Sequence, residues 1–168
     1  DAVRGKGANL TVTNAGTIRG GDRGVRLQDL ADTVTITNSG EISARRQAVR
    51  LDNGDALEDA TITNSGLIES TEGRAIQSRG PGTTIINDGL LRGNEEVVEA
   101  REGVSLTNTG TIALNGLDWD AGTQTWTNNG ATSDEDGVQF AGGTLTNSGV
   151  ILGTDDGVDV DQGRVENL

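Results

Sequence analysis

Acidic side chains gather at two places near the carboxyl end of this chain, and their spacing suits a metal ion. Asp134, Glu135 and Asp136 precede one Gly-Val pair, and Asp155 and Asp156 precede the next. If these segments stack in neighbouring turns of a repeat, five carboxylates come close together, and oxygen-only clusters of this kind suit Ca²⁺. The sequence therefore raises the hypothesis of a calcium site. It contains no EF-hand loop, so a solvated acidic surface is the alternative.

Three arginines form a second candidate site. Arg4, Arg26 and Arg50 recur at matching places in a repeat. Stacked guanidinium groups can bind the anionic groups of an acidic polysaccharide. The alternative is that they pair with acids in adjacent loops, namely Asp22, Asp29 and Asp52.

The composition excludes several kinds of chemistry. The chain has no Cys, His, Met or Tyr, which rules out disulfides, zinc-thiolate sites and a histidine base. No apolar run has the length of a membrane span, so we expect no membrane insertion by this segment. Spacing singles out no pair of catalytic acids, and we predict that the chain is not an enzyme. The alternative is a polysaccharide-active enzyme that uses outer-face carboxylates and arginine.

The elements that must position these residues come from a repeat of about twenty residues. Its marker is an asparagine with an apolar residue two places before it and, in the first seven copies, a glycine two places after it. The eight copies are Asn14, Asn38, Asn64, Asn87, Asn108, Asn128, Asn147 and Asn167. A period in this range indicates a solenoid.

Each repeat holds three short segments with alternating apolar residues, separated by Gly, Asn and Asp. This pattern predicts strands rather than helices. Strands that pair with their copies in the next repeat form an all-β, single-stranded parallel β-helix with three strands per rung and about eight rungs. We expect it to be right-handed, as parallel crossovers are. One domain, residues 1–168, is expected, and it resembles a fragment cut from a longer repeat rod.

The asparagines have a predicted structural role in this fold. Each lies two residues beyond an inward position, so stacked side-chain amides can bond along the rod as a ladder. Asn and Gly also tolerate the left-handed backbone that a sharp corner needs. Trp126 takes an inward position of its strand and is expected in the core.

Three segments carry a resemblance to a known family. They are 11–18, 34–42 and 106–112, which read TVTNAGTI, VTITNSGEI and LTNTGTI. They resemble the TNSGTI repeats of autotransporter passenger domains, which are surface proteins of Gram-negative bacteria. The resemblance implies an extracellular or cell-surface location and a structural or adhesive function. It leaves the ligand open, because such passengers include adhesins, self-associating proteins and enzymes.

The charge is distributed unevenly. Residues 1–84 carry 10 basic and 11 acidic side chains, whereas residues 85–168 carry 3 and 15. This acidic field argues against nucleic acid as a partner. Glycans or proteins of host or bacterial surfaces are the expected partners, together with copies of the same rod, because the two unlike halves can lie antiparallel.

Two further surfaces each have a functional interpretation and a structural alternative. Outward threonines in a Thr-x-Thr pattern, such as Thr35 and Thr37, resemble the surface of ice-binding solenoids, although Thr is also a good exposed strand residue. The longest connections, 28–33 and 52–60, fall on one corner of consecutive rungs and predict a raised acidic patch, with surface drift as the alternative.

Overall fold

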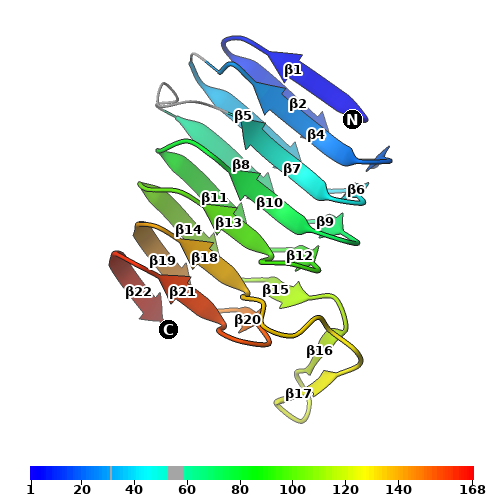
Figure 1. The fold of residues 1–168 in the computed structure, drawn as a ribbon, viewed down its shortest axis with the longest axis vertical. Helices are drawn as coiled ribbons and strands as arrows, with labels where there is room; N and C mark the ends of the chain where they lie inside the picture. Colours follow the sequence, from blue (N-terminus) through cyan, green and yellow to red (C-terminus); the bar gives the residue numbers. More distant parts are fainter. Residues whose placement is uncertain (31, 53–58) are drawn as a thin grey trace.

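The computed structural model describes residues 1–30, 32–52 and 59–168, and within these ranges the chain forms strands and no helix. Three sheets of parallel strands run side by side along a rod, and the chain visits them in turn (Figure 1). This confirms the predicted all-β parallel β-helix with three strands per rung.

The strands of each sheet are stacked from the amino-terminal to the carboxyl-terminal rung. Sheet A contains β1 (Val3–Lys6), β4 (Arg23–Gln28), β7 (Gln47–Asp52), β10 (Arg74–Ser78), β13 (Val98–Ala100), β18 (Val138–Phe140) and β21 (Val158–Val160). Sheet B contains β2 (Leu10–Asn14), β5 (Val34–Asn38), β8 (Ala60–Asn64), β11 (Thr83–Asn87), β14 (Val104–Asn108), β19 (Gly143–Asn147) and β22 (Gly163–Asn167). Sheet C contains β3 (Thr17–Gly20), β6 (Glu41–Ala44), β9 (Leu67–Ser70), β12 (Leu90–Gly93), β15 (Thr111–Leu114) and β20 (Val150–Leu152).

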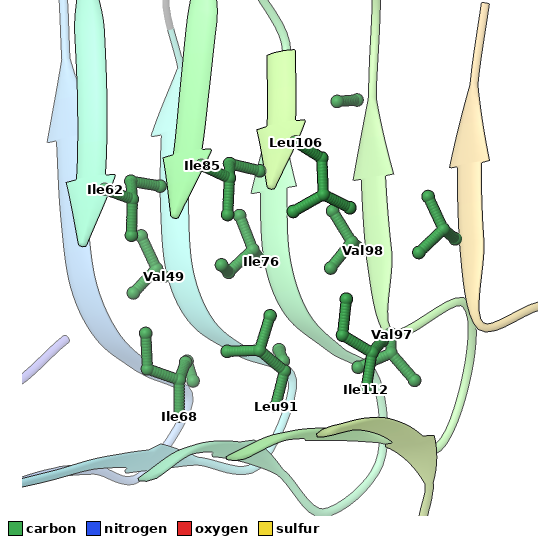
Figure 2. Close-up of a cluster of buried hydrophobic side chains, with 14 of the residues drawn as sticks. Val49, Ile62, Ile68, Ile76, Ile85, Leu91, Val97, Val98, Leu106 and Ile112 are labelled. Atoms are coloured by element: carbon green, nitrogen blue, oxygen red, sulfur yellow. The ribbon is translucent and has the colours of Figure 1, made fainter. Parts of the chain in front are cut away.

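The core is a narrow column of stacked apolar side chains. Sheet B contributes Ile62 and its equivalents, sheet C contributes Ile68 and its equivalents, and sheet A contributes Val49 and its equivalents (Figure 2). These three residues have no exposed surface. Each buried aliphatic side chain of this size stabilises the fold by roughly 1.5–3 kcal/mol. The predicted inward positions are therefore confirmed along most of the rod.

The asparagine ladder runs through the core side of sheet B. Each asparagine donates its side-chain amide to the carboxamide oxygen of the next, at 2.7–2.8 Å, in the order Asn14, Asn38, Asn64, Asn87, Asn108, Asn147 and Asn167. Each of the first six also donates to the carbonyl of the glycine two residues on. Because the amides are buried, these bonds satisfy polar groups that would otherwise be costly.

The glycines of the stacked corners, Gly40, Gly66, Gly89, Gly110 and Gly149, are required for a different reason from the predicted one. A Cβ on Gly66 would lie 2.1 Å from the carbonyl oxygen of Gly40, and a Cβ on Gly40 would lie 2.0 Å from that of Gly16. Neither glycine has a positive φ. The expectation of a left-handed corner is wrong here, because the corners stack too closely for a side chain.

One repeat leaves the rod. Residues of β16 (Leu117–Asp120) and β17 (Thr125–Asn128) form an antiparallel hairpin that projects beside the rod (Figure 1). Sheet B passes directly from Asn108 to Asn147. In the described residues, two of the sheets each stack seven strands, so the rod has about seven rungs, close to the predicted number of about eight. The prediction that Asn128 belongs to the ladder is wrong.

The displaced repeat differs from the others in its apolar residue. Trp126 stands where the other copies have Val, Ile or Leu, and a side chain of that size would overpack a narrow core. Trp126 is 53 % exposed, so its predicted place in the core is also wrong. It lies directly opposite Trp119 in the hairpin.

Candidate functional site

The outer face of sheet A carries one side chain per rung in a straight row. We call this the central row, and its members, from the first rung to the last, are Arg4, Arg26, Arg50, Gln77, Glu99, Gln139 and Asp159. The repeat predicts these residues as outward neighbours. The repeat also predicts Asp118 at the same position of the displaced copy, but Asp118 lies on the hairpin and not in the row.

The three arginines of the central row do stack on consecutive rungs, but two of them are occupied. Arg26 and Arg50 each donate from Nε to the carboxylate of Asp52, at 2.8 and 2.6 Å. Burial raises the pKa of Asp52, and the hydrogen bonds and charges of Arg50 and Arg26 outweigh burial and hold it below its usual range. Arg4 donates to Gln28 at 2.8 Å. Of the loop acids suggested by the sequence, Asp52 is the one that pairs with this ladder.

Positive charge is nevertheless crowded at this end of sheet A. Arg23 is half-buried and donates to Gln47 at 2.9 Å and to Asp22 at 2.7 Å. Burial lowers the pKa of Arg23; the carboxylate of Asp22 opposes this, and the charges of Arg50 and Arg26 add to it. The repulsion between Arg23 and the guanidinium groups of Arg26 and Arg50 shows that the positive charges lie close together at this end of the sheet.

Carboxylates dominate sheet A farther along the rod. Arg74 forms ion pairs with Glu95, Glu96 and Glu99, the last at 2.6 Å. Gln77 also donates to Glu99, at 2.6 Å. One guanidinium thus neutralises three neighbouring glutamates only in part.

The five carboxylates of the predicted calcium site do not converge. No group of three or more His, Cys, Asp or Glu side chains in the described ranges could hold a metal ion. Asp136 is buried and accepts the backbone N–H of Asp156 at 3.1 Å, whereas Asp134 and Asp155 are exposed. Residues 134–136 lie in a loop before β18, and Asp134 has a φ of 62°, so they do not continue the regular stacking of the strands. The predicted calcium grouping is therefore wrong.

The surroundings of two of these acids, Glu135 and Asp136, disfavour the ionised carboxylate. Burial raises the pKa of Glu135, and the charges of Glu96 and Glu95 raise it further. Burial also raises the pKa of Asp136, against the hydrogen bond from Asp156 and with the charges of neighbouring aspartates. Both groups lie beside like charges.

The outer face of sheet B carries two columns of mostly threonine. One column is Thr11, Thr35, Thr61, Thr84, Ser105 and Thr144, and the other is Thr13, Thr37, Thr63, Ile86, Thr107 and Thr146. The columns end at Arg164 and Glu166, which form an ion pair. Thr125 and Thr127, which the pattern placed in this array, lie on the hairpin instead.

Two arginines that the sequence did not single out share a recess. Arg79 and Arg101 line it with Pro81, Glu102 and Ala141, and its volume is about 360 Å³. Both arginines follow a sheet A strand by one residue, at β10 and β13. That common offset from the repeat marker is the signal that could have found them.

The predicted acidic patch of connections 28–33 and 52–60 falls partly on residues 31 and 53–58, which lie outside the described residues. Within the described part, Asp29 forms an ion pair with Lys6 at 2.5 Å, and Asp52 is engaged by Arg26 and Arg50.

Comparison with protein-family models, curated proteins and solved structures finds no match for this chain. In the described part of the chain, no helix is long and apolar enough to cross a membrane.

Proposed function

We propose that this chain is a structural and adhesive segment of a bacterial surface-exposed or secreted β-helix, and that its rods associate side by side. The TNSGTI-like repeats support a location on the bacterial surface or outside the cell. The observation that carries the proposal is the order of charges in the central row. The sign of these charges reverses along the rod.

The row carries positive charge before its middle rung and negative charge at two of the three positions after it, with the neutral Gln139 between them. Its first three positions are Arg4, Arg26 and Arg50, its fourth is the neutral Gln77, and its last three are Glu99, Gln139 and Asp159. When two copies lie antiparallel with these faces together, the first position of one meets the seventh of the other. Arg4 then faces Asp159, and Arg50 faces Glu99.

A twofold axis relates the two rods in this arrangement, so every contact occurs twice. The parallel arrangement would place arginine opposite arginine and is disfavoured. Complementary charge therefore selects one orientation.

The expected association is weak. Sheet A strands of three to six residues are ~10–20 Å long, and six rung steps of ~4.8 Å then give a face of roughly 300–600 Å² per rod. Both faces together reach at most about 1,200 Å², close to the lower limit of about 1,000 Å² for a specific interface. Exposed ion pairs also contribute little singly and are screened by salt.

Sedimentation of charge-reversal variants tests the proposal. We expect concentration-dependent dimers at low salt that dissociate at high salt. Arg4→Glu or Asp159→Arg alone should weaken dimerisation, and the double variant should restore it, because the two residues are six rungs apart in one rod and meet only between rods. Dimers unaffected by either single variant, or a parent that stays monomeric at low salt, would contradict the proposal.

An assay with polysaccharides distinguishes an adhesive function from an enzymatic one. A panel of acidic and neutral polysaccharides should be bound in part and cleaved in none. Release of reducing sugar by the purified chain would favour the polysaccharide-active enzyme instead.

The two columns of sheet B favour one second candidate, ice binding. They carry no charge over six rungs of a chain with a net charge of −13. Thr is stiff at χ1, so the hydroxyl and methyl groups form a regular array. The test is inhibition of ice recrystallisation, which Thr63→Tyr should abolish and Gln139→Tyr on sheet A should leave intact. Ice crystals that coarsen equally with and without the parent protein would exclude this candidate.

A further inference from the structure

The recess lined by Arg79 and Arg101 lies at the corner between sheets A and B. Ser78 and Ala100 are paired in neighbouring strands, so the two arginines that follow them lie on adjacent rungs. The chain turns just beyond each of them, where Gly82 and Gly103 have φ values of 74° and 72°. This shared turn leaves both guanidinium groups exposed on the same recess of about 360 Å³.

The two arginines differ from the other basic side chains of the protein. Ten of the 13 basic side chains form ion pairs within the described residues, and Arg4 hydrogen bonds to Gln28. In the described part of the chain, Arg79 and Arg101 have neither kind of partner. The chain has 26 acidic side chains, twice the number of basic ones, so carboxylates are plentiful. Within the described residues, two adjacent guanidinium groups that form no ion pair, with Glu102 in the same recess, are therefore an exception.

Adjacent rungs lie ~4.8 Å apart. Two like charges at about that spacing repel each other, and an anion between them removes the repulsion. A guanidinium presents a planar fork of N–H donors that fits the oxygens of a carboxylate or of a tetrahedral anion. The recess is thus complementary to an anionic group that two arginines hold together.

The rest of the lining narrows the class of ligand. Pro81 gives the recess an apolar surface, and Ala141 on the following rung leaves room beside the arginines. Glu102 lies in the same lining and can accept hydrogen bonds from hydroxyl groups. The volume is at the lower end of the range for small-molecule sites.

We propose that this corner binds the carboxylate or sulfate group of an acidic saccharide, with Arg79 and Arg101 holding the anion and Glu102 accepting from a sugar hydroxyl. The site lies off the central row and goes beyond rod association. It also replaces Arg4, Arg26 and Arg50 as the candidate anion site, because Asp52 already occupies two of those three.

Fluorescence anisotropy with two labelled probes tests the site at low salt. A heparin hexasaccharide presents sulfate, and a hexagalacturonate presents carboxylate alone. We expect the parent to bind at least one of them and Arg79→Gln/Arg101→Gln to weaken that binding about tenfold or more. The probe that binds identifies the anion.

The matched control is Arg45→Gln/Arg46→Gln, which removes the same charge from another exposed corner. It should change binding less than twofold. Equal weakening in both double variants would show a general charge effect and overturn the site, and so would a parent that binds neither probe. Circular dichroism of each variant verifies the fold. Sedimentation of Arg79→Gln/Arg101→Gln should still show dimers, so failure here is distinguishable from failure of rod association.

Discussion

Two regions of this protein share a local sequence but not a structure. Ile62-Thr63-Asn64-Ser65-Gly66 belongs to a rung, and Trp126-Thr127-Asn128-Asn129-Gly130 belongs to the hairpin. Asn64 donates to Asn87 at 2.8 Å inside the rod, whereas Asn128 accepts the backbone N–H groups of Gly130 and Ala131 at its own turn. Gly130 has a φ of 96° and nothing within 4 Å of a Cβ, unlike the tightly stacked Gly66.

The difference shows what the asparagine motif can and cannot specify. An asparagine followed by glycine fits a stacked corner or a free turn equally well. The choice depends on whether the preceding apolar residue fits the core, and Trp126 is too large for a column built of Val, Ile and Leu. Rung membership is thus decided by packing and not by the motif.

The largest expected effect comes from placing a charge at the apolar position of each region. Ile62→Asp buries an unpaired carboxylate and should lower the free energy of unfolding by ~4 kcal/mol or more. Trp126→Asp should cost only about 1 kcal/mol, because the side chain is exposed and loses one cross-strand pair. Chemical denaturation followed by circular dichroism measures both. Equal losses would mean that Trp126 is buried, and the outward Thr63→Asp serves as the control for Ile62→Asp.

A smaller contrast is expected at the asparagines. Asn64→Ala removes side-chain bonds to Asn87 and Gly66 and leaves buried groups without partners, so unfolding should become easier by roughly 3 kcal/mol. Asn128→Ala removes exposed turn bonds and should cost about 1 kcal/mol or less. Thermal unfolding of the two variants makes the comparison. A ladder that tolerates Asn64→Ala as well as the hairpin tolerates Asn128→Ala would contradict a structural role.

The smallest effect is a pH response of opposite sign in the two regions. Hydrogen bonds from Arg92 and Asn129 lower the pKa of Asp118, and the backbone N–H groups of Gly122 and Thr123 lower that of Asp120. Stability from such groups is present above about pH 4 and is lost as the pH falls through the lowered values. The hairpin should therefore loosen in acid.

The neighbouring rung should respond in the other direction. The raised pKa values of Glu135 and Asp136 contribute stability that is fully present below about pH 4 and is lost as the pH rises through the raised values. Hydrogen exchange of 117–128 reports the hairpin, and hydrogen exchange of 135–140 reports the rung. Asp136→Asn should reduce the pH dependence of the rung. Identical pH profiles in the two regions would refute this assignment.

Much of the fold followed from periodicity. The inward positions of Ile62, Ile68 and Val49 could be predicted because strand alternation and the repeat agree there. The exclusion of Trp126 could not, because motif spacing carries no information on core width. Arg79 and Arg101 lie outside the repeat marker, and only the three-dimensional structure shows that they share a recess and form no ion pair with the described residues. The calcium grouping could not be judged from the sequence, because residues 134–136 lie in a loop whose backbone, with a φ of 62° at Asp134, the repeat does not specify.

The central claim is that the Asn128 repeat is left out of the stacked rungs, and disulfide cross-linking tests it most directly. The neighbouring positions of Glu99 and Gln139 in the central row depend on the same claim. The chain has no cysteine, so paired substitutions are free of competing thiols. Thr107 and Thr146 are neighbours in sheet B, and their Cα spacing of ~4.8 Å falls within the range of a disulfide. Thr107→Cys/Thr146→Cys should therefore cross-link rapidly under mild oxidation, and Thr107→Cys/Thr127→Cys should not. Rapid cross-linking of the second pair, with none of the first, would place the Asn128 repeat inside the rod and contradict the account.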